Sequence, residues 1–200
     1  MLPDGTSAAT SNVATLTITA PGVLDLTDND LVIDYTGGNP IDSIRTMLID
    51  HRITSSLADS SVHTLGYADN AVTQMTTFSG QSVDPTSVLI KYTFFGDSDL
   101  DGDVDIADLG NLASNWQASG VWTGGDFDYN NTVDVNDLGL LASNWQAGVG
   151  APLTPTDGHS WALNDALASF GLPSASVPEP AGAGLVLAVA LRSHRRCWRR

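Results

Sequence analysis

Two near-copies of an aspartate-rich loop, each running into the same apolar segment, constrain this chain most. The first loop covers residues 97–108 (DSDLDGDVDIAD) and leads into LGNLASNWQ. The second covers residues 126–137 (DFDYNNTVDVND) and leads into LGLLASNWQ. The copies align without a gap at an interval of 126 − 97 = 29 residues, as a tandem duplication would. Each copy therefore predicts a loop followed by a short apolar helix.

Oxygen-bearing residues recur in both loops where a calcium loop of the EF-hand type carries its ligands. Such a loop uses positions 1, 3, 5, 7, 9 and 12, with a backbone carbonyl at 7 and a glycine at 6 for the sharp turn. Gly102 fills position 6 in the first loop, and Asn131, which tolerates a left-handed backbone, fills it in the second. The ligand positions for two calcium ions are Asp97, Asp99, Asp101, Asp103, Asp105 and Asp108, and Asp126, Asp128, Asn130, Thr132, Asp134 and Asp137.

An acidic chain could also place aspartates in turns without any metal. Two loops in register, each followed by a leucine-rich segment, argue against that alternative. Carboxylates about 6 Å apart repel each other by roughly 3 kcal/mol per pair at an effective dielectric constant near 20. We therefore expect each loop to fold around a cation. The apolar residues at position 8, Val104 and Val133, are expected to meet across a short β-bridge.

Charge limits the partners of the chain. The formal net charge is −15, and five of the eight basic residues lie in the last nine positions. Before them, only three basic residues face 23 acidic ones. Nucleic acid and anionic lipid are bound by clusters of Lys and Arg, so we expect no nucleic-acid partner and regard cations as the natural ligands. Cys197 is the only cysteine, which excludes a disulfide within the chain.

Residues 1–95 predict a mainly β region, because short apolar or alternating runs are separated by turn residues. Such strands suit a sandwich or the end of a β-solenoid. The expected strands are residues 15–19, 23–26, 31–35 and 87–95. Asn39 as a cap and Pro40 at the first helical position predict one helix, with Ile44 and Leu48 on its apolar face.

Residues 148–176 read as a linker followed by one short amphipathic helix. Apolar residues recur there near helical spacing, and we expect the helix to pack on the preceding repeats. Its apolar residues are Trp161, Leu163, Ala166, Leu167 and Phe170. Trp116 and Trp145 end the two apolar helices at the same position, which favours core packing over carbohydrate stacking.

A loop followed by a helix, with no helix before it, duplicated at this interval and ending in aspartate, resembles the type I dockerin module. The resemblance covers residues 96–147. It implies a small α-helical module that folds around two calcium ions and docks on a cohesin-like protein domain. In that family, loop positions 10 and 11 and the following helix contact the partner. The contact residues thereby implied are Ile106, Ala107, Leu109, Asn111, Leu112, Val135, Asn136, Leu138, Leu140 and Leu141.

The C-terminal residues 177–200 combine Pro178, Glu179 and Pro180 with an apolar run and terminal arginines. This arrangement resembles the PEP-CTERM sorting signal of exported bacterial proteins. The resemblance implies recognition by an exosortase-type processing enzyme, contact with a membrane through this tail alone, and a final location at the cell surface or outside the cell. Residues 1–6 lack the features of a signal peptide, so we expect either a C-terminal piece of a longer exported protein or a misassigned start.

The expected fold class is therefore mixed. A mainly β region, solenoid-like or sandwich-like, would precede a small α-helical dockerin-type module with two calcium loop-helix repeats, then a linker and a C-terminal helix. The expected function is a non-catalytic, calcium-dependent docking and surface-display unit. Two alternatives stay open: a C-terminal piece of an exported polysaccharide-degrading enzyme system, and a structural adhesin stalk stabilised by calcium. Residues 1–95 contain no Glu and no recognisable nucleophile motif, which argues against catalysis there.

The two loops should bind calcium unequally. The first loop has carboxylates at positions 1, 3, 5 and 12, whereas Asn130 replaces one of them in the second, so the first should bind more tightly. Calorimetric titration of the chelator-treated chain should resolve two sites. Asp99→Asn should weaken the tighter one, and loss of the weaker one instead would reverse the assignment.

Overall fold

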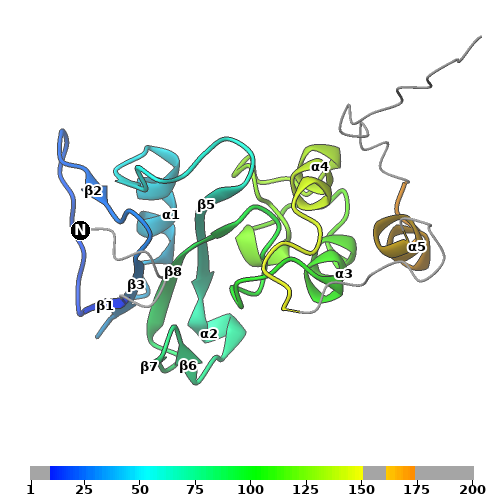
Figure 1. The fold of residues 1–200 in the computed structure, drawn as a ribbon. Coiled ribbons are helices and arrows are strands. Elements are labelled where there is room, and N and C mark those ends of the chain that lie inside the picture. Colours follow the sequence, from blue (N-terminus) through cyan, green and yellow to red (C-terminus); the bar gives the residue numbers. More distant parts are fainter. Residues whose placement is uncertain (1–9, 151–160, 174–200) are drawn as a thin grey trace, which may run out of the picture.

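The computed structural model describes residues 10–150 and 161–173, which form a mixed α/β fold, mostly β, around a four-stranded sheet (Figure 1). The strand order is β1-β3-β8-β5. The strands are β1 (Thr10–Val13), β3 (Asp30–Asp34), β5 (His63–Asp69) and β8 (Ser87–Phe94). β1 runs parallel to β3, and β8 runs antiparallel to both β3 and β5. β8, the longest strand, therefore lies inside the sheet and leads directly into the first aspartate loop.

Short elements surround this sheet. Two further pairs of strands are β2 (Leu24–Asp25) with β4 (Ile53–Thr54), parallel, and β6 (Thr77–Phe78) with β7 (Gln81–Ser82), antiparallel. The described residues form five α-helices: α1 (Ile41–Ile49), α2 (Asn70–Thr73), α3 (Ile106–Ser114), α4 (Val135–Ser143) and α5 (Trp161–Ser169). A 3-10 turn, η1 (Trp122–Gly124), lies between the two repeats.

The sheet is covered on both faces. Ile90 pairs with Leu31 on one side and Tyr67 on the other, so the three side chains share one face, and α1 packs there with Ile44 buried. The opposite face carries Gly66, where an added Cβ would lie 2.6 Å from Trp122 and 2.7 Å from Leu100. The absence of a side chain at Gly66 therefore lets the repeats approach the sheet closely.

The expected fold class is wrong. Neither a solenoid end nor a sandwich is present among the described residues, and the loop-helix repeats are not a small helical module beside the sheet. They share one hydrophobic core with it. The buried Trp122 indole donates to the carbonyl oxygen of Asp97 over 2.7 Å, the Tyr129 hydroxyl donates to the Leu65 carbonyl oxygen on β5, and the Asn144 amide donates to Ser61 over 2.8 Å.

Several elements confirm the sequence-based expectations. Strands 31–35 and 87–95 correspond to β3 and β8, and both loops lead into α3 and α4. The helix expected after Asn39 forms as α1 but begins one residue later than expected, because Pro40 takes the N-cap position; the backbone N–H of Ile41 donates to the Asn39 side chain over 3.0 Å. The strand expected at residues 15–19 does not form.

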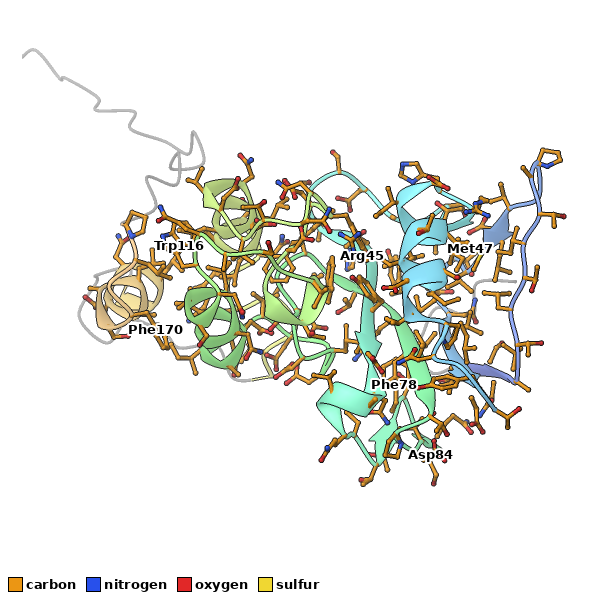
Figure 2. The ribbon with its side chains drawn as sticks, turned by 180° about the vertical axis from the view of Figure 1, so that it is seen from behind. Arg45, Met47, Phe78, Asp84, Trp116 and Phe170 are labelled. Carbon is orange, nitrogen blue, oxygen red and sulfur yellow. The ribbon has the colours of Figure 1, made fainter. Side chains whose placement is uncertain are left out.

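The C-terminal helix also forms where it was expected. α5 packs beside α3, where Phe170 lies 3.6 Å from the position of a Cβ on Gly110 (Figure 2). Trp116 and Trp145 are partly buried and pack against the core, as expected from their equivalent positions in the two repeats. The sorting motif Pro178, Glu179 and Pro180 lies outside the described residues.

The shared core predicts a single unfolding transition. Trp122→Ala should lower the free energy of unfolding by about 3–5 kcal/mol, because it empties a fully buried site between the sheet and both loops. Urea unfolding, followed by far-UV circular dichroism and by tryptophan fluorescence, measures this change. Trp145→Ala, at a partly buried site, is the control and should cost less. Two separate transitions in the wild-type chain would contradict the shared core.

Candidate metal centre

The two loops have the same backbone conformation. Position 4 is left-handed in both, with φ 61° at Leu100 and 63° at Tyr129. Position 6 is also left-handed, with φ 103° at Gly102 and 71° at Asn131. The sharp turn predicted at position 6 is therefore confirmed in both copies, and Asn131 takes the role that Gly102 has in the first.

The aspartate at position 1 organises each turn from inside. Asp97 accepts hydrogen bonds from the backbone N–H groups of Asp101, over 3.1 Å, and Gly102, over 3.0 Å. Asp126 accepts one from Asn131 over 3.1 Å. Both carboxylates are fully buried. The rest of each loop thus folds around a buried carboxyl group.

The aspartate at position 12 ties the start of each loop to the start of its helix. Asp108 accepts from the backbone N–H groups of Ser98, over 2.7 Å, and Asp105, over 2.8 Å. Asp137 likewise accepts from Phe127, over 2.7 Å, and from Asp134, over 2.9 Å. The position 9 aspartates cap α3 and α4, so both helices begin with a capping box.

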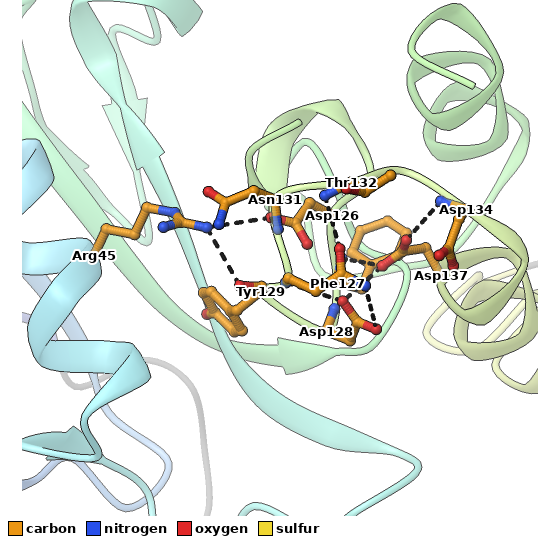
Figure 3. Close-up of polar contacts among 10 residues, drawn as sticks. Arg45, Asp126, Phe127, Asp128, Tyr129, Asn131, Thr132, Asp134 and Asp137 are labelled. Carbon is orange, nitrogen blue, oxygen red and sulfur yellow. Dashed lines mark hydrogen bonds and ion pairs between the residues drawn. The ribbon is translucent and has the colours of Figure 1, made fainter. Parts of the chain in front are cut away.

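Positions 1, 3 and 12 converge in both loops. Ligand oxygens of Asp97, Asp99 and Asp108 lie within 4.8 Å of one another, and those of Asp126, Asp128 and Asp137 do the same (Figure 3 shows the second loop). A further group in the first loop combines Asp103, Asp105 and Asp108. Three of the predicted ligands in each loop therefore share one small space.

The remaining predicted ligands are engaged within the loops. The carboxylate of Asp101 accepts from the backbone of Asp103 over 2.9 Å, and the Asn130 amide oxygen accepts from Thr132 over 2.7 Å. These bonds order the stretch that carries the carbonyl groups of position 7. Asp134 accepts from the backbone of Asn136 over 2.7 Å as part of its capping role.

Burial disfavours the ionised form of these aspartates. Burial raises the pKa of Asp97 and of Asp108 to about 7, and the neighbouring loop carboxylates add to the rise. Burial also raises the pKa of Asp137 to about 6 and that of Asp126 above its ordinary value. The buried Oδ1 of Asp126 accepts no hydrogen bond from the described residues. A cation would satisfy that oxygen and keep the cluster ionised, so the buried aspartates can hold a metal ion.

Residues of the sheet and of α1, which sequence reasoning missed, complete the surroundings of the loops. Lys91 on β8 donates to the carbonyl oxygen of Leu100 over 2.6 Å, and the Thr93 hydroxyl donates to the carboxylate of Asp97. Arg45 on α1 lies 3.4 Å from Asp126. Arg45 and Lys91 are two of the three basic residues that precede the C-terminal tail, and that scarcity was the one signal that could have singled them out.

The residues implied as partner contacts divide by burial. Ile106 is 49% exposed and Val135 is 65% exposed, and Ala107 and Asn136 beside them are also exposed. Asn111 and Leu140 are partly buried. Four leucines face the core and are at most 2% exposed, so they cannot contact a partner in this structure: Leu109, Leu112, Leu138 and Leu141.

Val104 and Val133 do not form the bridge expected between them. The backbone of Val104 exchanges hydrogen bonds of 2.8–2.9 Å with residues 146–147, and Val133 does so over 2.8–3.0 Å with residues 117–118. The two stretches 117–118 and 146–147 occupy equivalent places in the repeat. Each loop therefore pairs with the residues that follow the helix of the other copy, which interlocks the two repeats.

Comparisons of the chain with protein-family models, with curated proteins and with solved structures find no match. The proposed function is therefore argued from the geometry of the two loops.

None of the helices among residues 10–150 and 161–173 combines the length and apolar character that crossing a bilayer requires.

The raised pKa values predict a pH effect on the metal-free protein. The folded-state pKa of Asp97 and Asp108, about 7, lies above the ordinary value of 3.8, so their contribution to stability is complete below about pH 4 and is lost as pH rises through 7. In chelator, the melting temperature should fall between pH 5 and pH 8. Asp108→Asn should flatten this fall, whereas the same change at the exposed Asp50 should not. A melting temperature that rises across this range would contradict the assignment.

Proposed function

We propose that this protein is a non-catalytic, calcium-dependent docking unit. The observation that carries the proposal is the convergence of positions 1, 3 and 12 in two loops of identical design, each around a buried carboxylate. The donors are oxygen atoms throughout. Oxygen donors of this kind, in a twelve-residue loop, favour calcium over the softer transition metals, which prefer nitrogen or sulfur.

Each calcium ion would be held by the carboxylates at positions 1, 3 and 12 together with the other predicted oxygen ligands of its loop. It would supply positive charge that the loops need, because every buried carboxylate there otherwise repels its neighbours. Residues of the chain itself orient the ligands and the helices. The backbone donors to Asp97, Asp108 and Asp137 keep their oxygens oriented, and the capping aspartates fix α3 and α4 relative to the loops.

The docking surface we propose consists of the position 10 and 11 pairs, Ile106-Ala107 and Val135-Asn136. They are exposed and occupy equivalent places at the first turn of α3 and α4. Their positions depend on the loops directly before them, so calcium binding would set the orientation of the pairs. The partner would be a cohesin-like protein domain, as the resemblance to type I dockerins implies. The buried leucines of the same helices serve the core instead.

A second candidate function is a structural adhesin stalk in which calcium only stabilises the fold and no docking partner binds. The shared core of the sheet and the repeats favours it, because metal-dependent ordering of the loops would then stabilise the whole chain. Export and surface display, with processing at Pro178, Glu179 and Pro180, are part of both proposals and rest on the sequence of the tail.

Binding to cohesin-like domains separates the two candidates. Biolayer interferometry with immobilised cohesin-like domains should give binding in calcium and none in chelator. Val135→Asp should weaken binding by at least about tenfold, because it places a charge in a desolvated contact. Val72→Asp, at a residue that is 75% exposed on α2, is the matched control and should leave binding unchanged. A chain that binds calcium and no cohesin-like domain would favour the stalk.

A further inference from the structure

Arg45 reaches the second loop from outside the repeats. It lies on α1, and its Nη2 is 3.4 Å from Oδ2 of Asp126 and 3.4 Å from the carbonyl oxygen of Tyr129 (Figure 3). The two partners are 81 and 84 residues away in sequence. The Arg45 side chain is only 18% exposed, and Asp126 is fully buried. A cation from the other part of the fold is thus built into the wall of the second loop.

The two oxygens of Asp126 have different surroundings. Oδ2 faces Arg45 and also accepts from the backbone of Asn131. Oδ1 is buried and accepts no hydrogen bond from the described residues. Arg45 therefore lies beside the carboxylate cluster and leaves one oxygen of Asp126 for a ligand. It offsets part of the negative charge of the cluster and leaves space for a ligand.

The first loop has a related but different neighbour. Position 4 accepts a hydrogen bond from a basic side chain in both loops, through Leu100 from Lys91 and through Tyr129 from Arg45. Position 1 differs, because Asp97 accepts from the neutral hydroxyl of Thr93 and has the charge of Lys91 nearby, whereas Asp126 pairs directly with the guanidinium. Among the described residues, a direct ion pair with the first ligand therefore occurs only in the second loop.

We propose that Arg45 is a built-in counter-ion that lowers the metal affinity of the second loop and holds this loop folded before metal arrives. A guanidinium next to a ligand carboxylate repels an incoming divalent cation and weakens the negative potential that attracts it. In the metal-free chain the same charge offsets the burial of Asp126. The second loop becomes a preformed, weaker site whose occupancy is coupled to α1. This inference rests on the proposed calcium function.

The test isolates the second loop in the full chain. Asp99→Asn with Asp101→Asn silences the first loop, and calorimetric calcium titration then reports on the second alone. In this background Arg45→Met should tighten calcium binding by about tenfold or more, since one unit charge near the site is removed. The metal-free melting temperature should fall at the same time. Arg45→Lys, which keeps the charge, should restore affinity close to that of the background.

Arg52→Met is the matched control. It removes the same charge, but Arg52 contacts Asp50 and the carbonyl oxygen of Ile18 rather than the second loop. Equal affinities in the background, Arg45→Met and Arg52→Met proteins would overturn the proposal and leave calcium binding intact. No calcium binding by the wild-type chain would overturn the proposed function itself. If Arg45→Met does not fold without metal, Arg45→Gln carries the same expectation of tighter binding.

Discussion

Two fully buried aspartate carboxylates, Asp97 and Asp126, determine what must surround the two loops. Each lies inside a tight loop, where Asp97 accepts hydrogen bonds from two backbone N–H groups and Asp126 accepts one. A buried anion is tolerated only with strong compensation. The chain supplies part of it through Lys91, Thr93 and Arg45, which come from β8 and α1. The acidic loops therefore require the sheet and the helix beside them.

This requirement explains why the repeats and the sheet share one core. Trp122 lies on Gly66 and donates to Asp97, so one residue joins the central sheet to the first loop. Tyr129 stacks on Tyr67, with ring centroids 5.8 Å apart, and joins β5 to the second loop. Packing and charge compensation thus act at the same places. A change in either loop is expected to reach the sheet, which a self-contained module would not allow.

The sequence predicted the loops and their helices well because their signals are local. Within each copy, the aspartates, the turn residue (Gly102 or Asn131) and the apolar run lie close together in sequence. Contacts between residues that are far apart in the sequence leave no such local pattern. β5 was missed because Gly66 interrupts its run of strand formers, and Arg45 gave no hint that it would meet Asp126. Burial of Leu109 and Leu138 in a shared core likewise depends on partners far along the chain.

We propose that each loop holds one calcium ion through the carboxylates at positions 1, 3 and 12. A crystal structure of the full chain grown in calcium, with an anomalous difference map collected at long wavelength, tests it most directly. We expect two anomalous peaks, one within reach of Asp97, Asp99 and Asp108 and one within reach of Asp126, Asp128 and Asp137. Loops with this same backbone and no peak in either would contradict it.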